Sequence, residues 1–259
     1  MRSSEWVSFV YFAALTAIAW LRPLPSARRI QITAIGLLSS VAVVTGARLA
    51  APAVRDWMPP LVILAGYFLS GRFFVNPSPS FEAWLIAWDR RLLGDPATRF
   101  AHWPRALLAY LEIVYMGCVV LVPAGFAALA WTGRSALADS YWTLVTAAEF
   151  GSFASLGVVQ ARPPWMVERK AVLSDRSVHR AASMMVEHLT IRANTFPSGH
   201  VAGSLAAALA VMRAMPGLGL VLLFFAGSIA AACIVGRYHY IVDVVTGVLL
   251  TVLIWSVVT

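Results

Sequence analysis

The chain has 259 residues, of which 60% are hydrophobic and 12% charged, and its mean hydropathy is +0.76. Soluble globular domains carry about 25% charged residues, so this composition excludes a protein that covers its whole surface with polar side chains. The formal net charge of +8 comes from basic residues in short loops between apolar stretches, a pattern that argues against nucleic-acid binding.

The apolar stretches form eight runs, and a transmembrane helix needs about 20 residues. Because lipid offers the backbone no hydrogen-bond partners, each run is expected to be helical. We predict an all-α, polytopic transmembrane bundle of about eight spans, forming one domain over residues 1–259. The runs are Trp6–Leu21, Ile30–Ala47, Met58–Val75, Leu107–Trp131, Tyr141–Gln160, Val201–Met212, Gly217–Val235 and Tyr240–Val258.

Two segments between the runs stand out. Phe81–Leu93 places Phe81, Leu85 and two tryptophans at helical spacing, with Asp89 and two arginines mostly off that face. This pattern is typical of an amphipathic helix at the membrane interface. Residues 161–197 form the longest polar stretch, and long loops in compact proteins are usually functional or mobile.

The basic residues are distributed unevenly between the two predicted faces. An even number of spans puts both termini on one side, where about 5 of the 20 basic residues lie, and about 15 lie on the other. That second face suits anionic lipid headgroups or a phosphate. All basic residues except Lys170 are arginines, which fits bidentate phosphate binding but also a simple compositional bias. Cys118 and Cys233 lie in apolar runs, so neither a disulfide nor a metal site is expected.

The first chemical signal is the sequence Ala-Arg-Pro-Pro-Trp at 161–165. Arg162 follows directly on a predicted span and precedes two prolines, so its guanidinium is stiffly placed to grip phosphate oxygens. An interfacial arginine after a span is common, so this signal alone means little.

The second signal is Asn-Thr-Phe-Pro-Ser-Gly-His at 194–200. Ser198 and Gly199 stand at the start of a predicted helix, where backbone N–H groups lack intrahelical partners and attract anions. His200 follows as a proton donor or acceptor. Ser-Gly before a helix is also ordinary capping.

The third signal is Gly-Arg-Tyr-His-Tyr-Ile-Val-Asp at 236–243. His239 and Asp243 are four residues apart and share one helix face, so the carboxylate can fix the histidine tautomer. The parity of the spans brings all three signals to one membrane face, which favours a functional site over three separate structural features.

Other ionisable residues give weaker signals. Glu112 and Glu149 lie within apolar runs, where an acid indicates function or pairs with an arginine at a helix end. His102, His179 and His188 are interpreted as solvated loop residues.

These motifs resemble the type 2 phosphatidic acid phosphatase (PAP2) superfamily. Its pattern is a lysine with a downstream Arg-Pro, then Pro-Ser-Gly-His, then an arginine, a histidine and an aspartate. Two positions depart from it, because Ser155 stands where the family has its lysine and Cys233 where it has its last arginine. Arg162 remains, and Arg237, Lys170 or Arg192 are candidate substitutes.

The resemblance implies a six-helix catalytic core over residues 53–259, with motifs in 161–247 and two extra N-terminal spans in 1–52. It further implies a phosphohistidine mechanism without metal or other cofactor. His239 is then the nucleophile oriented by Asp243, and His200 protonates the leaving oxygen. The implied phosphate-binding residues are Arg162, Ser198, Gly199, Arg237, Lys170 and Arg192.

The function that the resemblance implies is an integral-membrane lipid phosphate or polyprenyl diphosphate phosphatase. The first alternative is a phospholipid head-group phosphotransferase, similar to inositol phosphorylceramide synthases. The second is a non-catalytic lipid-binding or transport protein, although both histidines and the aspartate are present and no repeated halves are found. We expect lipid partners and a bacterial plasma-membrane location. Family resemblance favours an extracytoplasmic site, whereas the basic bias of that face favours the cytoplasm.

Overall fold

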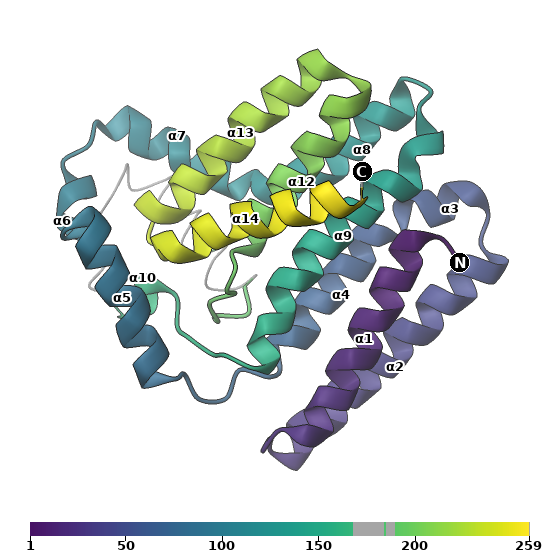
Figure 1. Ribbon diagram of the computed structural model, residues 1–259, viewed down its shortest axis with the longest axis horizontal. Coiled ribbons are helices and arrows are strands. Elements are labelled where there is room, and N and C mark those ends of the chain that lie inside the picture. The colour runs from purple at the N-terminus through teal and green to yellow at the C-terminus, as the bar shows by residue number, and fades with distance from the viewer. Residues whose placement is uncertain (168–183, 185–189, 259) are drawn as a thin grey trace.

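The computed structural model describes residues 1–167, 184 and 190–258. Over these residues the secondary structure is helical, apart from one isolated bridge between Ala161 and Asn194. Figure 1 shows the helices lying against one another in a single body. The predicted all-α class is confirmed.

The α-helices lie within or beside the predicted apolar runs. They are α1 (Ser3–Leu21), α2 (Ser26–Leu49), α3 (Pro52–Trp57), α4 (Pro59–Gly71), α5 (Pro79–Leu93), α6 (Pro96–Ala101), α7 (Arg105–Met116), α8 (Cys118–Trp131), α9 (Ala138–Ala154), α10 (Pro164–Val167), α12 (Gly199–Ala214), α13 (Pro216–Val235) and α14 (Ile241–Val258).

The lengths of the helices identify the chain as a membrane protein. Among the described residues, α1, α2, α13 and α14 are each long and apolar enough to cross a bilayer. Helices α7 and α8 add a fifth span if they are counted as one helix bent by 60°. Helices α4, α9 and α12 have 13, 17 and 16 residues, so a count of eight spans stays a prediction.

Helices α9 and α12 form the centre of the bundle. Helix α12 packs against α8, α9, α13 and α14, and α9 also contacts α1 and α4. The buried face of α12 consists mainly of alanine, glycine and serine, and such small residues let helix backbones approach closely. The Thr251 hydroxyl of α14 donates to the Ala202 carbonyl at 3.2 Å, which ties α14 to this centre.

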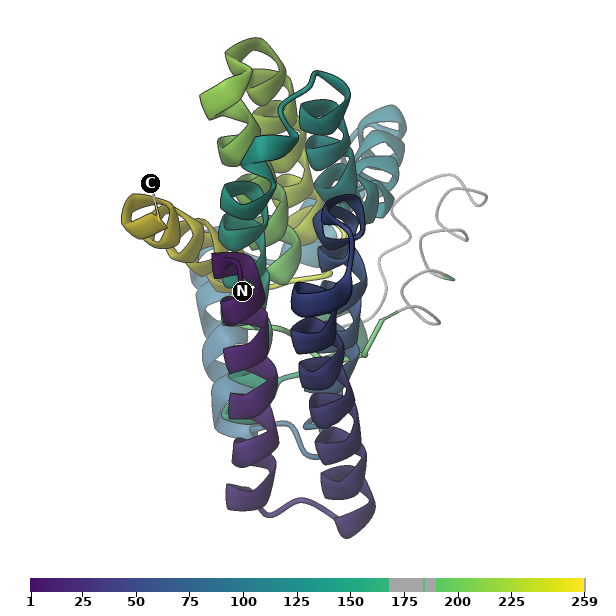
Figure 2. The same cartoon turned by 90° about the vertical axis from the view of Figure 1, so that its right-hand side faces the viewer.

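The N-terminal helices α1 and α2 stand side by side as an antiparallel pair (Figure 2). A cluster that includes Phe12, Leu15 and Phe150 packs this pair against α4 and α9. At one end, Glu5 accepts two hydrogen bonds of 2.8 Å from the Arg55 guanidinium. The pair is therefore integrated into the bundle, and the proposed division at residue 52 stays a prediction.

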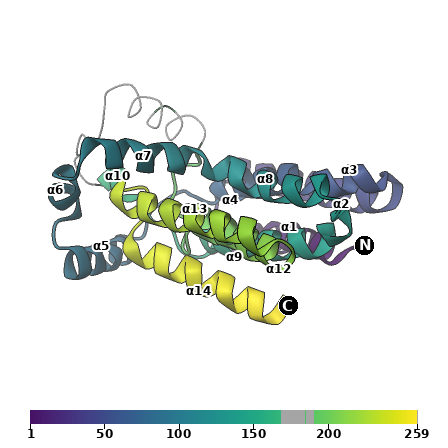
Figure 3. The ribbon, with the colours of Figure 1, turned by 90° about the horizontal axis from the view of Figure 1, so that it is seen from above.

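Helix α5 lies at the opposite end of the molecule from the N-terminus (Figure 3). Ser78 caps its start by accepting a 3.4 Å hydrogen bond from the Phe81 N–H, and Gly94 ends it at a φ of +76°. The predicted helix is present, but the expected orientation of Asp89 was wrong. The buried residues of α5 are Glu82, Leu85 and Asp89, because both carboxylates pair with arginines from other segments.

Candidate active site

The structure brings His200, His239 and Asp243 together, from α12, the turn before α14, and α14. His239 Nδ1 lies 3.3 Å from Asp243 Oδ2, and its Nε2 lies 3.3 Å from His200 Nδ1. The same Asp243 oxygen accepts the Tyr240 N–H at 2.9 Å. Asp243 and His239 are 0% and 4% exposed, so the pair is shielded from solvent.

The hydrogen bonds indicate which ring nitrogen of each histidine carries the proton. A carboxylate only accepts, so Nδ1 of a neutral His239 carries the proton and Nε2 presents a lone pair. His200 Nδ1 then donates to that lone pair, and the Tyr115 hydroxyl donates to His200 Nε2 across 3.5 Å. This arrangement leaves the lone pair of His239 Nε2 directed toward His200.

The segment before α12 is held mainly by backbone contacts. The Ser198 N–H donates to the Asp243 carbonyl at 2.9 Å, and the Gly199 N–H donates to Thr195 Oγ1 at 3.3 Å. Ser198 and Gly199 are both buried. The two amides that we expected to face a phosphate therefore have protein partners in this structure, and their predicted role stays a prediction.

The turn that carries His239 is hydrogen-bonded to the Arg-Pro-Pro segment. Both the Tyr238 and the His239 N–H groups donate to the Cys233 carbonyl, at 2.9 and 3.0 Å. The Trp165 N–H donates to the Arg237 carbonyl at 3.0 Å. The first and third motif segments are thus joined directly by the backbone.

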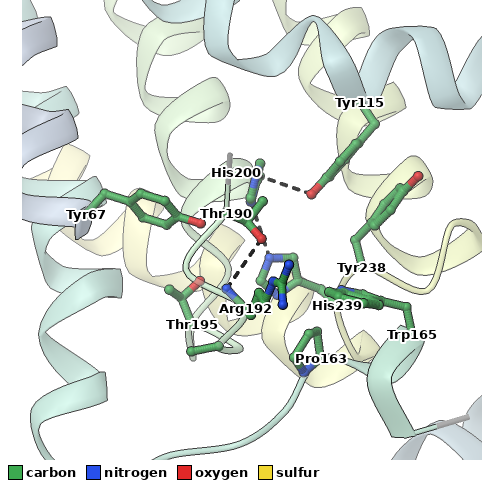
Figure 4. A pocket seen from close by; sticks show the side chains of 11 residues that line it. Tyr67, Tyr115, Pro163, Trp165, Thr190, Arg192, Thr195, His200, Tyr238 and His239 are labelled. Atoms are coloured by element: carbon green, nitrogen blue, oxygen red, sulfur yellow. Dashed lines mark hydrogen bonds between the residues drawn. The ribbon is translucent and has the colours of Figure 1, made fainter. Parts of the chain in front are cut away.

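A pocket of about 350 Å³ opens beside the two histidines (Figure 4). Tyr115 is one wall, stacked between Tyr238 at 3.7 Å and His200 at 5.1 Å between ring centres. Arg192 is the basic residue, among those described, that lines this pocket. The lining residues are Tyr67, Tyr115, Pro163, Trp165, Thr190, Arg192, Ala193, Thr195, His200, Tyr238 and His239.

Two other predicted phosphate-binding cations, Arg162 and Arg237, are not among the described residues that line this pocket. Arg162 forms a two-pronged pair with Glu82, from Nε at 3.0 Å and Nη2 at 2.8 Å. These hydrogen bonds hold the pKa of the Glu82 carboxyl below its usual value. Arg237 is buried against Asp89, with Nη1 and Oδ2 2.7 Å apart. Lys170 lies outside the described residues.

The two positions that depart from the family pattern have structural contacts instead. The Ser155 hydroxyl donates to the Ser152 carbonyl at 2.9 Å and accepts the Phe196 N–H at 3.4 Å. Cys233 is fully buried in α13, beneath the turn that its carbonyl holds. Both cysteines of the chain are free, as expected.

Three residues in contact with the site or its arginines were missed by sequence reasoning: Glu82, Asp89 and Tyr115. The acids were detectable in principle, since Glu82, Leu85 and Asp89 follow a helical i, i+3, i+7 pattern on one face. Nothing in the sequence near Tyr115 indicates its stacking on His200, because α7 precedes α12 by more than eighty residues.

The remaining ionisable residues are spread over different surroundings. The Glu149 carboxylate packs on α12, with its Oε2 3.3 Å from where a Cβ on Gly199 would lie. Glu112 is buried and lines a smaller pocket of about 190 Å³. His102 is exposed, whereas His179 and His188 lie outside the described residues. No cluster of three or more potential metal ligands occurs in the part of the chain that the structure describes.

A family model described as the PAP2 superfamily matches residues 83–257, about two thirds of the chain. The chain belongs to the PAP2 superfamily. The match begins within α5 and includes all three motif segments. PAP2 proteins are generally phosphatases, so membership supports an enzyme with a phosphatase-type function. No curated protein and no solved structure matches the chain.

Proposed function

We propose that this PAP2 protein is a metal-independent phosphatase for a lipid phosphate or polyprenyl diphosphate. The observation that carries the proposal is the connected row Asp243–His239–His200 at the wall of a pocket. The carboxylate fixes the tautomer of His239, and the second histidine stands beside the nucleophilic nitrogen. This is the arrangement needed for a covalent phosphohistidine followed by hydrolysis.

In the first step, the Nε2 lone pair of His239 attacks phosphorus and the bond to the leaving oxygen breaks. His200 takes up a second proton from solvent when the anionic substrate binds, and it gives that proton to the leaving oxygen, so that the alcohol or phosphate leaves protonated and His200 becomes neutral again. In the second step, water attacks phosphorus and the P–N bond breaks. The proton of the water passes to His200, which restores both histidines and releases phosphate.

A phosphoryl group bonded to His239 Nε2 would occupy the place that His200 Nδ1 has in this structure, 3.3 Å away. We therefore expect the His200 ring to turn about its side-chain bonds when substrate binds. Arg192, which lines the same pocket, is placed to meet the phosphoryl oxygens as negative charge spreads over them. The aromatic walls leave an apolar surface for the part of the lipid next to phosphate.

The location proposed is a bacterial plasma membrane with the pocket on the extracytoplasmic side. With an even number of spans, both termini lie on the side opposite the motif segments. Reporter fusions at the C-terminus should then be active only as cytoplasmic reporters. A C-terminus outside the cell would contradict the proposed orientation.

The activity test is phosphate release by purified protein in detergent. The panel is phosphatidic acid, undecaprenyl diphosphate, phosphatidylglycerophosphate and a sphingoid phosphate, each with and without EDTA. We expect EDTA-resistant release from at least one lipid, abolished in His239→Ala. His102→Ala is the matched control, because His102 is exposed and directly follows α6, outside the three motif segments.

Absence of release from every lipid would contradict the phosphatase proposal. The same incubations with added diacylglycerol or inositol would then test for a phosphotransferase, in which a lipid or polyol hydroxyl replaces water. Protein that neither hydrolyses nor transfers, although it binds the lipids, would indicate the non-catalytic alternative.

A further inference from the structure

Asp89 belongs to α5, outside the motif segments, yet its carboxylate contacts both ends of the turn that carries His239. Its Oδ1 accepts the Ile241 N–H at 2.8 Å, and its Oδ2 lies 2.7 Å from Arg237 Nη1. The side chains of Asp89 and Arg237 are 1% and 6% exposed. His239 stands midway between these two points of attachment.

The backbone of this turn requires a restraint. Arg237 has a φ of +58°, a left-handed conformation that L side chains adopt when surrounding contacts hold them there. The contacts among the described residues include the ion pair with Asp89, the hydrogen bond from the Trp165 N–H to the Arg237 carbonyl, and the hydrogen bond from the Arg237 N–H to the Ile234 carbonyl at 3.2 Å. The ion pair is the contact by which α5 restrains the side chain of Arg237, and its loss removes that contact.

The second attachment acts on the catalytic carboxylate. Ile241 is the first residue of α14, and its N–H is one of the groups that a helix start leaves without an intrahelical partner. Asp89 fills that vacancy from another helix and fixes where α14 begins. Asp243 follows two residues later and orients His239. Asp89 thus restrains both the nucleophile and the residue that orients it.

A parallel contact supports a bracing role for α5. Glu82 stands seven residues before Asp89, two helical turns away on the same buried face. It accepts hydrogen bonds from the Arg162 N–H at 2.7 Å and from the Arg162 guanidinium. Helix α5 therefore holds one arginine of each of the two arginine-bearing motif segments.

We propose that Asp89 is a positioning residue for His239, and that Arg237 is its structural partner rather than a ligand of phosphate. The burial of the Arg237 guanidinium against α5, off the pocket wall, supports this assignment. The assignment rests on the proposed function, in which His239 attacks phosphorus. A displacement of about 1 Å at a reacting group can lower a rate on the order of 100-fold.

The test uses full-length protein in detergent, with phosphatidic acid and p-nitrophenyl phosphate as probes. The variants are Asp89→Asn, Asp89→Ala, Arg237→Gln and the double variant Asp89→Ala/Arg237→Gln. Arg90→Gln is the matched control, an exposed neighbour on the same helix. Three quantities are measured: kcat and KM, the melting temperature, and hydrogen–deuterium exchange of peptides that cover residues 236–243.

We expect Asp89→Ala and Arg237→Gln to lower kcat by about 10- to 100-fold with KM within about threefold. Asp89→Asn keeps an acceptor for the Ile241 N–H, so its kcat should fall less than that of Asp89→Ala. The kcat of the double variant should lie within about twofold of the kcat of the less active single variant, because both changes remove the same ion pair. Residues 236–243 should exchange faster in Asp89→Ala and unchanged in Arg90→Gln.

Two results would overturn the assignment. One is a higher KM in Arg237→Gln, together with a double variant in which the effects of the two single changes add in full. That result would make Arg237 a phosphate ligand. The other is unchanged exchange at 236–243 in Asp89→Ala. If the unmodified protein hydrolyses neither probe, the proposed function is contradicted for those probes, and the exchange measurement still decides whether Asp89 restrains the turn.

Discussion

Gly219 of α13 is where a close approach between the backbones of two helices can be tested. A Cβ added there would lie 2.5 Å from Met212 Cβ and 2.7 Å from Met212 N, so Gly219→Ala forces α12 and α13 apart at their connected ends. Gly227 lies in the same helix with nothing within 4 Å of an added Cβ. Both changes gain the same helix propensity, about 1 kcal/mol, so the difference between them isolates packing.

Overpacking of a close contact costs about 1–3 kcal/mol. A domain of this size shifts its Tm by about 2–4 °C for each kcal/mol, so Gly219→Ala should melt about 2–12 °C below Gly227→Ala. The assay is thermal unfolding in detergent followed by intrinsic fluorescence of the tryptophans. Equal melting temperatures, or a higher one for Gly219→Ala, would refute the close approach of α12 and α13.

Four further predictions concern single side chains. Asp243→Asn keeps the shape of the carboxylate but loses its charge, and should lower kcat on the order of 100- to 10,000-fold with little change in melting temperature; an unchanged kcat would remove Asp243 from the mechanism. His200→Ala should lose more activity on phosphatidic acid than on p-nitrophenyl phosphate, whose leaving group needs no proton; equal losses would argue against His200 as the acid. Glu5→Gln should lower the free energy of unfolding by about 1–3 kcal/mol because it breaks the pair with Arg55. Glu149→Gln should leave the melting temperature unchanged or raise it, since no ion pair to Glu149 is found among the described residues. A large fall in the melting temperature of Glu149→Gln would reveal a partner.

The sequence predicts the helical class and the contact between His239 and Asp243 well, for a physical reason. Long hydrophobic runs indicate a lipid environment, in which the backbone must be helical. A spacing of four residues on a helix places His239 and Asp243 on one face, whatever surrounds them. We could also expect His200 to lie near this pair, because an even number of predicted spans places the three motif segments on the same membrane face. The number of spans could not be fixed the same way, since α4, α9 and α12 are shorter than the runs that contain them.

The arginines show where sequence spacing stops being informative. Arg162 and Arg237 are both predicted to bind phosphate, a role that stays a prediction, and the structure pairs each with a carboxylate of α5 that lies 80 and 148 residues away in the sequence. Such partners depend on how helices dock, which neither periodicity nor local spacing encodes. The orientation of α5 was misjudged for the same reason, because an acid counts as a polar-face residue until its buried partner is known.

This pairing also bears on what the pocket can bind. Ser155 and Cys233 supply no charge where the family pattern has a lysine and an arginine, and Arg162 and Arg237 are already neutralised by α5. Arg192 is the one basic side chain that the described residues place on the pocket wall. A phosphate held by few fixed charges gains less from electrostatics, so more of its binding energy must come from apolar contact with the aromatic walls. On the proposed function, the described part of the pocket wall leads us to expect a phosphate attached to a lipid, rather than a small soluble phosphate, as the substrate.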